Sequence, residues 1–474
     1  MDVRLRAATA TVVVLVCVGA ASVLSRAVTS PDLLADSGLA IASATMPLCC
    51  KNIEHSREFE MRKELPEAPI KPAMTDAVHQ THPALPGWQV GVFATACALS
   101  VATNYYIQAL TPAIATDLHE PGPTVGLLVT LAQIGFAVGV IFIVPAGDLV
   151  RRKPLVCLLL GGTAGALALA AAAPNLTALA CALLLASLCS VAAQILVPLA
   201  ATLASPDRQG RVVGQVMSGL LVGVLLARTI AGLVAAHGGW RLMYGVAAAL
   251  VAAIAIVLVF SLPDVAPSST LSYPRLLKSI GSLLVEHPQL RVRIAYGAIT
   301  FAGFGSLWTT VALLAADRYH YGEATIGLLA LVGAAGALCA QGAGRLVDRG
   351  RLHTATGIFL VAILMGWVFA AFGAHNIIAL LTALILIDIG VQGVHIANQS
   401  AIYRLDLAAR SRINSAYIAF YFLGGATGST IAAIAYGHRG WRAVVLAGII
   451  FGIIGLLMWM LRLLAGRDRI PSAT

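Results

Sequence analysis

Two ionisable residues, Arg228 and Asp388, lie deep inside long apolar stretches of this sequence. If these stretches cross a lipid bilayer, each charge costs about 2.5–3.5 kcal/mol at the bilayer centre unless it is paired or hydrated. The two residues could form a structural ion pair that holds two helices together, or they could bind a proton or a substrate. We favour the second interpretation because Asp388 has polar neighbours on its own segment.

Three polar residues follow Asp388 at intervals of four, seven and eleven residues: Gln392, His395 and Gln399. This spacing places all four side chains on one face of a helix. Such a face must meet a cavity rather than lipid. A carboxylate that alternates between buried and hydrated surroundings changes its proton affinity. We therefore expect Asp388 to exchange a proton and His395 to relay it or contact the substrate. Arg228 supplies the opposing charge or contacts an anionic substrate.

Polar and aromatic residues also gather at helical spacing in three other apolar segments. Residues 88–116 carry Ser100, Asn104, Gln108 and Thr111 beside Tyr105. Residues 176–204 carry Ser190 and Gln194, and residues 292–315 carry Ser306, Trp308 and Thr309. An isolated polar residue in an apolar helix more often joins two helices, but four coincident stripes favour a cavity. The predicted substrate-binding and cavity residues are Asn104, Tyr105, Gln108, Gln194, Trp308, Gln392, His395 and Gln399.

The overall composition shows which environment these residues occupy. Of the 474 residues 59% are hydrophobic and only 11% are charged, with a mean hydropathy of +0.87. A soluble domain carries about 25% charged residues, so most of this chain must face lipid. The net charge of +10 is spread in single residues and short clusters between apolar runs. This pattern is typical of membrane orientation signals and excludes a nucleic-acid surface.

Enzyme classes find no support in the sequence. It contains no Gly-x-Ser-x-Gly, no phosphate-binding loop and no paired catalytic carboxylates. The eight cysteines show no metal or redox spacing, and six of them lie in apolar stretches where a free cysteine behaves as a small hydrophobe. We therefore expect no catalytic residue, no metal and no cofactor.

Twelve segments are apolar enough to cross a membrane, which takes roughly 20 residues. They run approximately over 88–116, 124–146, 154–173, 176–204, 211–236, 240–262, 292–315, 325–343, 355–374, 377–403, 412–436 and 442–465. The chain then divides into an extension (1–87), a six-helix bundle (88–262), a central loop (263–291), a second six-helix bundle (292–466) and a tail (467–474). In the central loop, Tyr273–His287 is amphipathic and is expected to lie on the membrane surface.

The distribution of Lys and Arg predicts the orientation of the twelve segments. With the region before the first segment inside, eighteen basic residues fall on the inside and four on the outside. Both ends of the unit are therefore predicted to be cytoplasmic. Met1–Arg6 followed by Ala7–Leu24 resembles a signal peptide or an extra span, which would reverse this orientation. Our hypothesis is that residues 1–87 are weakly structured or outside the natural product, with Met74 as a sensible start.

The two halves of the chain repeat each other. Gly147-Asp148 follows the second apolar segment and Gly344–Gly350 follows the eighth, which places Asp148 and Asp348 200 residues apart. Two parallel six-helix bundles about a central axis form a transporter architecture with its site between them. Two further pairs recur at an offset of 201 residues: Arg211 with Arg412, and Trp240 with Trp441.

The loop Asp148–Lys153, its echo at Gly344–Gly350, the twelve segments and the long central loop resemble the major facilitator superfamily over roughly residues 88–466. Three further motifs resemble its subgroup of bacterial drug/proton antiporter-like exporters: Asn104–Leu110, Gln194–Pro198 and Arg211–Gly214. The fifth segment differs, because Leu226-Ala227-Arg228-Thr229 stands where that subgroup carries a Gly-Pro pair.

The resemblance implies an all-α integral membrane protein with twelve transmembrane helices in two pseudo-symmetric bundles. It implies alternating access, with a cytoplasmic gate formed by charge contacts among Asp148, Arg152, Asp348 and Arg349. We expect a monomer in the bacterial inner membrane that exports a small amphiphilic or drug-like molecule in exchange for protons. The alternatives are an uptake symporter of the same fold and a membrane sensor that has lost transport.

Overall fold

The computed structural model describes residues 86–205, 207–265, 272–339, 346, 349, 351–406 and 409–465. Within these residues the regular structure is helical, which confirms the predicted all-α membrane fold. Three predictions lie outside or almost outside the described residues. They are the state of the extension 1–87, of which only the last two residues are described, the tail 467–474 and the placement of Asp348.

The N-terminal half begins with a bent span. Helices α2 (Gly87–Ala102) and α3 (Tyr106–Leu118) meet at an angle of 42° and together correspond to the predicted segment 88–116. Next come α4 (Gly122–Phe142), the short 3-10 helix η2 (Pro145–Asp148) and α5 (Arg152–Ala171). The predicted segment 176–204 is also interrupted, into α6 (Leu176–Cys189) and α7 (Ala192–Leu203).

Helix α8 (Gln209–Ser261) contains two predicted segments joined without a loop. Its 53 residues would extend roughly 80 Å as a straight helix, far more than the roughly 30 Å of a bilayer core. The helix is kinked where Gly238 and Gly239 leave helical geometry, and Gly239 has a φ of 75°, which glycine adopts without strain. The predicted boundary between 211–236 and 240–262 falls at this kink.

The central loop and the C-terminal half follow the predicted order. Helix α9 (Tyr273–Glu286) buries Leu276, Ile280 and Leu283, so the predicted amphipathic helix forms. The remaining helices are α10 (Pro288–Tyr319), α11 (Glu323–Cys339), α13 (Leu352–Phe372), α14 (Ile377–Ile402), α15 (Arg410–Arg439) and α16 (Trp441–Leu464).

The described helices suit a multi-pass membrane protein. Within the described residues, nine helical spans are long and apolar enough to cross a bilayer, and the bent pair α2–α3 makes a tenth. Because α8 is long enough for two crossings and α11 is a shorter apolar helix, the structure is consistent with twelve. Large apolar side chains stay exposed on the outer helices, including Leu158 and Phe260 at 72% and 84%. Such exposure is expected where the neighbour is lipid.

The internal repeat is visible in the helix ends. His119 and His320, 201 residues apart, both end helices in the left-handed conformation, with φ values of 56° and 54°. Gly239 and Gly440 form a second pair at the same offset, with φ values of 75° and 63°. Asn175 and Asn376 form a third, because each side chain caps the helix that follows it.

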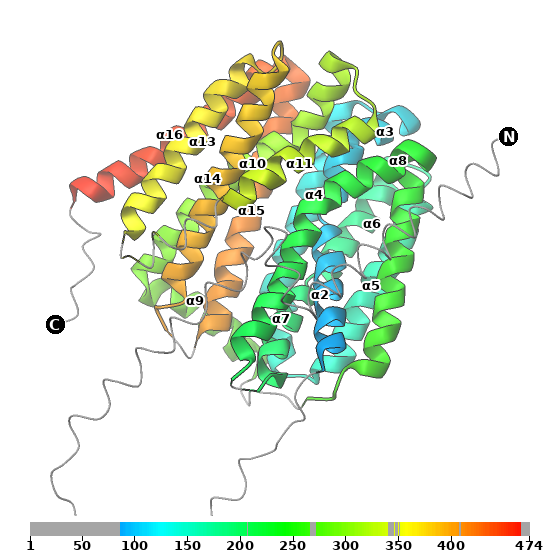
Figure 1. Cartoon of the computed structure of the whole chain (residues 1–474), viewed down its shortest axis with the longest axis vertical. Helices are drawn as coiled ribbons and strands as arrows, with labels where there is room; N and C mark the ends of the chain where they lie inside the picture. The colour runs from blue at the N-terminus through cyan, green and yellow to red at the C-terminus, as the bar shows by residue number, and fades with distance from the viewer. Residues whose placement is uncertain are drawn as a thin grey trace, which may run out of the picture.

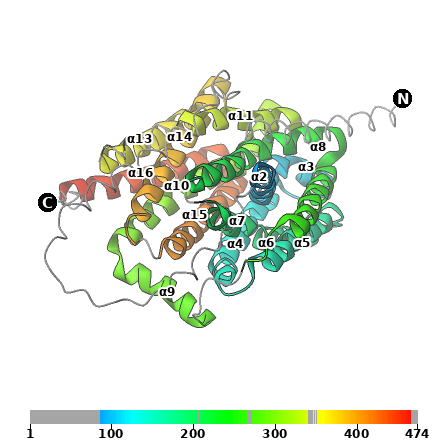
Figure 2. The ribbon, with the colours of Figure 1, turned by 60° about the horizontal axis from the view of Figure 1, so that its bottom comes forward.

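The two halves lie side by side and contact each other along α4 and α15, α8 and α11, and α3 and α10 (Figures 1 and 2). Phe136 of α4 and Phe422 of α15 pack with ring centroids 4.3 Å apart. Helix α9 lies across one end of the molecule, where it contacts η2 of the N-terminal half and α10 and α15 of the C-terminal half.

Candidate functional site

The Arg228 side chain on α8 is buried at the contact between the two halves, with 5% exposure. Its Nε donates a hydrogen bond of 2.5 Å to Oε1 of Gln108 on α3. Its guanidinium carbon lies 4.2 Å from the ring centroid of Trp308, 4.8 Å from that of Tyr105 and 5.4 Å from that of Phe304. One amide and three aromatic faces therefore stabilise the buried cation.

The next residue along α8 holds this arrangement in place. Thr229 Oγ1 donates a hydrogen bond of 2.9 Å to the carbonyl oxygen of Gly327 on α11. The contact crosses from the N-terminal to the C-terminal half, so the position of Arg228 depends on how the halves are docked.

The Asp388 carboxylate on α14 is buried to a similar extent, with 4% exposure. Gly333 of α11 lies directly against it, and a Cβ atom at that position would collide with Asp388 Oδ2 and come within 2.9 Å of Trp308. The absence of a side chain at Gly333 therefore makes room for the carboxylate. An acidic residue buried to this degree in a membrane helix is a candidate functional group.

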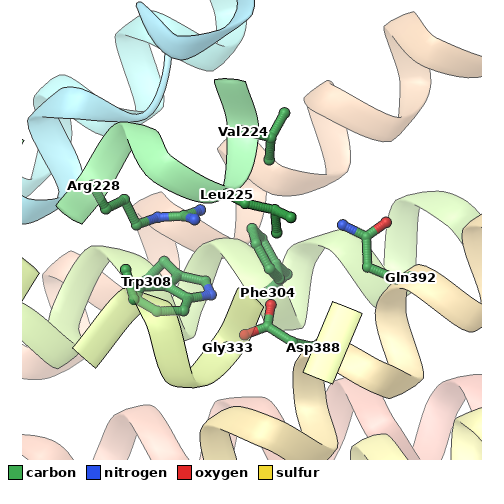
Figure 3. Close-up of a pocket in the computed structure, with 9 residues that line it drawn as sticks. Val224, Leu225, Arg228, Phe304, Trp308, Gly333, Asp388 and Gln392 are labelled. Atoms are coloured by element: carbon green, nitrogen blue, oxygen red, sulfur yellow. The ribbon is translucent and has the colours of Figure 1, made fainter. Parts of the chain in front are cut away.

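Arg228 and Asp388 face one small cavity between α8, α10, α11 and α14 (Figure 3). Its volume open to water-sized molecules is about 10 Å³, enough for roughly one water. Among the described residues the two charged groups form no ion pair. Arg228 Nη2 and Asp388 Oδ2 likewise have no hydrogen-bond partner within that part of the chain. The lining residues are Val224, Leu225, Arg228, Phe304, Trp308, Ala330, Gly333, Asp388 and Gln392.

A second cavity of the same size shares the lining residues Arg228 and Trp308 with the first. Gln108 lines this second cavity together with apolar residues of α10 and α11. Of the predicted site residues, Arg228 and Trp308 therefore line both cavities and Gln108 lines the second. The structure thus brings together five predicted site residues around this centre: Tyr105, Gln108, Arg228, Trp308 and Asp388, with Gln392 at its edge.

His395 lies about two turns along α14 from Asp388, outside the residues that line the cavity. Its Nδ1 is 3.1 Å from the hydroxyl of Tyr417, and its ring centroid is 4.7 Å from that of Tyr421. Asn398 also donates a hydrogen bond of 3.4 Å to the Tyr417 hydroxyl. His395 therefore belongs to a polar aromatic cluster between α14 and α15.

Asn104 occupies the break between α2 and α3, where it contacts the other interrupted span. Its Nδ2 donates a hydrogen bond of 2.9 Å to Ser190 Oγ, which in turn donates to the carbonyl oxygen of Ser187. Ser100 donates to the carbonyl oxygen of Ser190. These contacts join the two broken spans inside the N-terminal half. The predicted residues Gln194 and Gln399 are half-buried and do not line the two cavities.

Two of the predicted gate residues, Asp148 and Arg152, lie near α9, because Asp148 ends η2, which contacts α9, and Arg152 begins the next helix. Arg152 Nη2 forms an ion pair of 3.3 Å with Asp148, and its Nε donates to the carbonyl oxygen of Gly147. Both contacts lie within the N-terminal half. Arg349 is exposed, while Asp348 lies outside the described residues.

The internal repeat gives the Arg228 site a counterpart in the C-terminal half. At an offset of 201 residues, Ser429 corresponds to Arg228 and Thr309 corresponds to Gln108. Thr309 Oγ1 donates a hydrogen bond of 3.0 Å to Ser429 Oγ, and Gln133 Nε2 of α4 donates to the same oxygen at 3.2 Å. This counterpart is a small neutral cluster held by protein–protein hydrogen bonds.

Sequence reasoning missed two residues that shape the site, Phe304 and Gly333. Phe301, Phe304 and Trp308 recur at intervals of three and four residues, a helical stripe that could have indicated an aromatic wall. Gly333 carried no such signal, because its role depends on a contact between α11 and α14. Among the described residues, no group of three or more His, Cys, Asp or Glu side chains is arranged to hold a metal ion.

Comparison with known proteins adds family information to this geometry. The chain matches the Major Facilitator Superfamily over residues 92–406. The uncharacterized transporter YgaY of Escherichia coli O157:H7 is 44% identical over 387 residues, which cover 81% of this chain and 97% of that protein. The probable transporter SCO4007 of Streptomyces coelicolor is 34% identical over 352 residues, covering 73% and 81%.

Solved structures of transporters share the fold at low sequence identity. A bacterial homolog of the human lysosomal transporter Spinster, in an inward-facing and occupied conformation, aligns with a TM-score of 0.64 at 13% identity, covering 81% of this chain and 98% of that one. The nucleoside transporter NupG aligns with a TM-score of 0.63 at 12% identity, covering 78% and 99%. The human organic anion transporter MFSD10 aligns with a TM-score of 0.60 at 18% identity, covering 78% and 98%.

Proposed function

The chain belongs to the Major Facilitator Superfamily and is a membrane transport protein rather than an enzyme, and from this premise we propose that it exports a small amphiphilic molecule in exchange for protons. Asp388 binds and releases the proton. The observation that supports this most strongly is the burial of Asp388 and Arg228 in one small cavity between the two halves. This function also agrees with the resemblance to drug/proton antiporter-like exporters.

The location of the cavity couples proton binding to movement. Arg228 belongs to α8 of the N-terminal half, whereas Phe304, Gly333 and Asp388 belong to the C-terminal half. If the halves rock against each other, as alternating access requires, the cavity opens and water reaches the carboxylate. Hydration favours the charged carboxylate and burial favours the neutral acid. Each cycle therefore changes the proton affinity of Asp388.

The lining of the cavity favours a small amphiphilic substrate. Drug-sized ligands need clefts of about 300–1,000 Å³ lined by apolar and aromatic groups with a few placed polar groups. The described cavity has this chemical character but only about 10 Å³ of free space. We infer that it represents a closed conformation, and that the substrate enters when the halves separate.

We further propose that both ends of the helical unit face the cytoplasm in a bacterial inner membrane and that the transporter works as a monomer. The basic end carrying α9 and Arg152 is then the cytoplasmic end. Asp148, Arg152, Asp348 and Arg349 are proposed as the gate there. The Arg152–Asp148 pair would hold the N-terminal side of that gate in shape.

Everted membrane vesicles test the coupling and the direction together. Respiration acidifies the vesicle interior, which quenches a pH-sensitive dye, and candidate amphiphiles are added outside. An antiporter moves protons out as substrate enters, so an active compound restores the fluorescence. We expect this response from the wild type and none from Asp388→Asn.

A matched carboxylate variant controls for insertion and folding. Asp264 is 47% exposed and pairs with Arg151 at 2.8 Å on the surface of the N-terminal half. Asp264→Asn removes the same charge far from the cavity and should respond like the wild type. A full response from Asp388→Asn would overturn the proposed coupling site.

Uptake by proton symport is the second candidate, and the unpaired Nη2 of Arg228 favours it. An anion bound at Arg228 would repel a charged Asp388 and so promote its protonation. In everted vesicles a symporter carries protons inward with the substrate, so the compound deepens the quench, whereas an antiporter restores the fluorescence. A protein that has become a sensor gives no substrate-dependent signal.

A further inference from the structure

Two opposite charges in the same small cavity each have an open binding position. Arg228 Nη2 and Asp388 Oδ2 are buried, lack hydrogen-bond partners among the described residues and belong to side chains that face the cavity. In the view of Figure 3 the ring of Phe304 lies between the two charged groups. One group can donate to a ligand and the other can accept from it.

We propose that the substrate is zwitterionic, with an anionic group that binds Arg228, a cationic group that binds Asp388 and an apolar body against the aromatic wall. This inference rests on the proposed function and adds the chemical class of the substrate. It concerns both charges together, whereas the proton-coupling proposal concerns Asp388 alone.

The charge balance of the cavity distinguishes this class from the alternatives. A purely anionic ligand pairs with Arg228 but favours a protonated Asp388, so it releases no proton for exchange. A purely cationic ligand pairs with the Asp388 carboxylate and leaves the Arg228 cation buried without a partner. An uncompensated buried charge is strongly unfavourable. A neutral apolar ligand leaves both groups unpaired. A ligand with both charges satisfies both positions and keeps the filled cavity neutral.

The remaining walls specify the rest of the ligand. Trp308 and Phe304 present aromatic surface beside Arg228, and Val224, Leu225 and Ala330 present aliphatic surface. None of these side chains offers a charged partner. An apolar or aromatic group attached to the zwitterionic head therefore fits this lining.

The same arrangement accounts for the exchange of a proton. When the cationic group of the ligand reaches Asp388, the neutral acid gives its proton to water and the resulting carboxylate pairs with the ligand cation. When the ligand leaves on the other side, the carboxylate takes up a proton from that side. One proton thus moves against one net-neutral ligand, and no other reactant is needed.

A matched series of three small probes tests the proposal on the purified full chain in lipid nanodiscs. Phenylalanine carries both charges, 3-phenylpropionate lacks the ammonium group and 2-phenylethylamine lacks the carboxylate. Binding is followed by tryptophan fluorescence, because Trp308 lines the cavity. We expect phenylalanine to bind at least about tenfold more tightly than either singly charged probe, as expected when a buried charge loses its partner.

Variants assign each charge to its partner. Arg228→Gln should abolish the preference for phenylalanine over 2-phenylethylamine, and Asp388→Asn should abolish its preference over 3-phenylpropionate. Arg228→Lys keeps the charge and should keep part of the first preference, which separates loss of binding from misfolding. Asp264→Asn should keep both preferences.

Equal or tighter binding of either singly charged probe by the wild type would overturn the zwitterion proposal. So would the failure of all three probes to bind, or preferences that Arg228→Gln and Asp388→Asn leave unchanged. These outcomes are distinct from failure of the proposed function. If only the proposed function failed, the probe preferences would hold, but vesicles of the wild type and of Asp388→Asn would give the same proton response.

Discussion

Arg228 and Ser429 occupy equivalent positions in the two halves of the repeat, yet their surroundings have diverged. Arg228 bonds to Gln108 and leaves Nη2 open toward a cavity. Ser429 receives hydrogen bonds from both Thr309 and Gln133 and joins α10, α15 and α4. The comparison supports the proposal that Arg228 binds a ligand, whereas its counterpart Ser429 joins helices.

The neighbouring threonines strengthen this comparison. Thr229 follows Arg228 and donates to the carbonyl oxygen of Gly327 across the contact between the halves. Thr430 follows Ser429 and pairs with Thr130 at 3.1 Å across the pseudo-equivalent contact. Both copies therefore keep a hydroxyl that joins the two halves. The divergence is concentrated at the residue immediately before it.

Arg228→Ser, which gives this position the side chain of its counterpart, should have the largest effect. Arg228→Ser removes the cation from the cavity, so substrate-dependent proton movement should fall at least about 100-fold, as when one partner of a buried charge contact is truncated. Everted vesicles measure it. Ser429→Ala should keep transport within about threefold, because Ser429 contacts neither charged group.

Ser429→Ala should instead lower stability. It leaves Gln133 Nε2 and the Thr309 hydroxyl without their shared acceptor, which costs about 1–3 kcal/mol for buried polar groups. Thermal unfolding in detergent measures this loss. If Ser429→Ala abolished transport as Arg228→Ser does, the two regions would share one function and the comparison would fail.

Gly333→Ala should have the next largest effect, because the added methyl group collides with the Asp388 carboxylate and crowds Trp308. Overpacking of this kind costs about 1–3 kcal/mol, and it displaces the group proposed to bind the proton. We expect proton-coupled transport to fall about tenfold in the vesicle assay. Gly161→Ala on α5, where a Cβ meets no atom within 4 Å, is the matched control and should behave like the wild type.

Trp308→Phe should have a moderate effect on the same site. The guanidinium of Arg228 lies 4.2 Å from the Trp308 ring centroid, and phenylalanine keeps an aromatic face with a weaker cation–π interaction. A loss of about 0.5–1 kcal/mol corresponds to a two- to fivefold weaker apparent affinity. Dose–response curves in vesicles provide the measurement. An unchanged affinity would contradict a role for the indole in holding the cation.

The smallest expected effect is a matched loss of stability at a feature that the two halves still share. Asn175 caps α6 through the N–H of Ala178, and Asn376 caps α14 through the N–H groups of Ile378 and Ala379. Replacing either by Ala should cost about 1 kcal/mol, measured by thermal unfolding. Transport should not change. A large difference between the two variants would show that the repeat has also diverged at its helix caps.

Much of the fold could be predicted because it depends on local sequence. Apolar runs of membrane length locate the spans, and landmarks such as Trp240 and Trp441 reveal the repeat. The kink in α8 falls at Gly238 and Gly239, where the sequence already separated two segments. The interruptions at Asn104 and Ser190 were missed, because the surrounding residues are apolar enough to read as continuous helices.

The candidate site was predictable only in part. Helical spacing identified the polar face of α14, and structure places Asp388 and Gln392 at the cavity. The spacing of polar residues along a helix does not show which neighbouring helix or cavity these residues contact. Asn104 therefore contacts Ser190 within its own half, and His395 contacts Tyr417, although both were predicted to line the cavity. The fit of Gly333 against Asp388 depends on two helices distant in sequence.

The most direct test of the central claim is the number of protons released when a transported compound binds to purified protein in weakly buffered nanodiscs. The compound is one that the vesicle screen identifies, and a pH-sensitive dye reports the release. The account predicts release of up to one proton per bound molecule from the wild type and from Asp264→Asn, and none from Asp388→Asn. Equal release from wild type and Asp388→Asn would contradict the assignment of the exchanged proton to the cavity between Arg228 and Asp388.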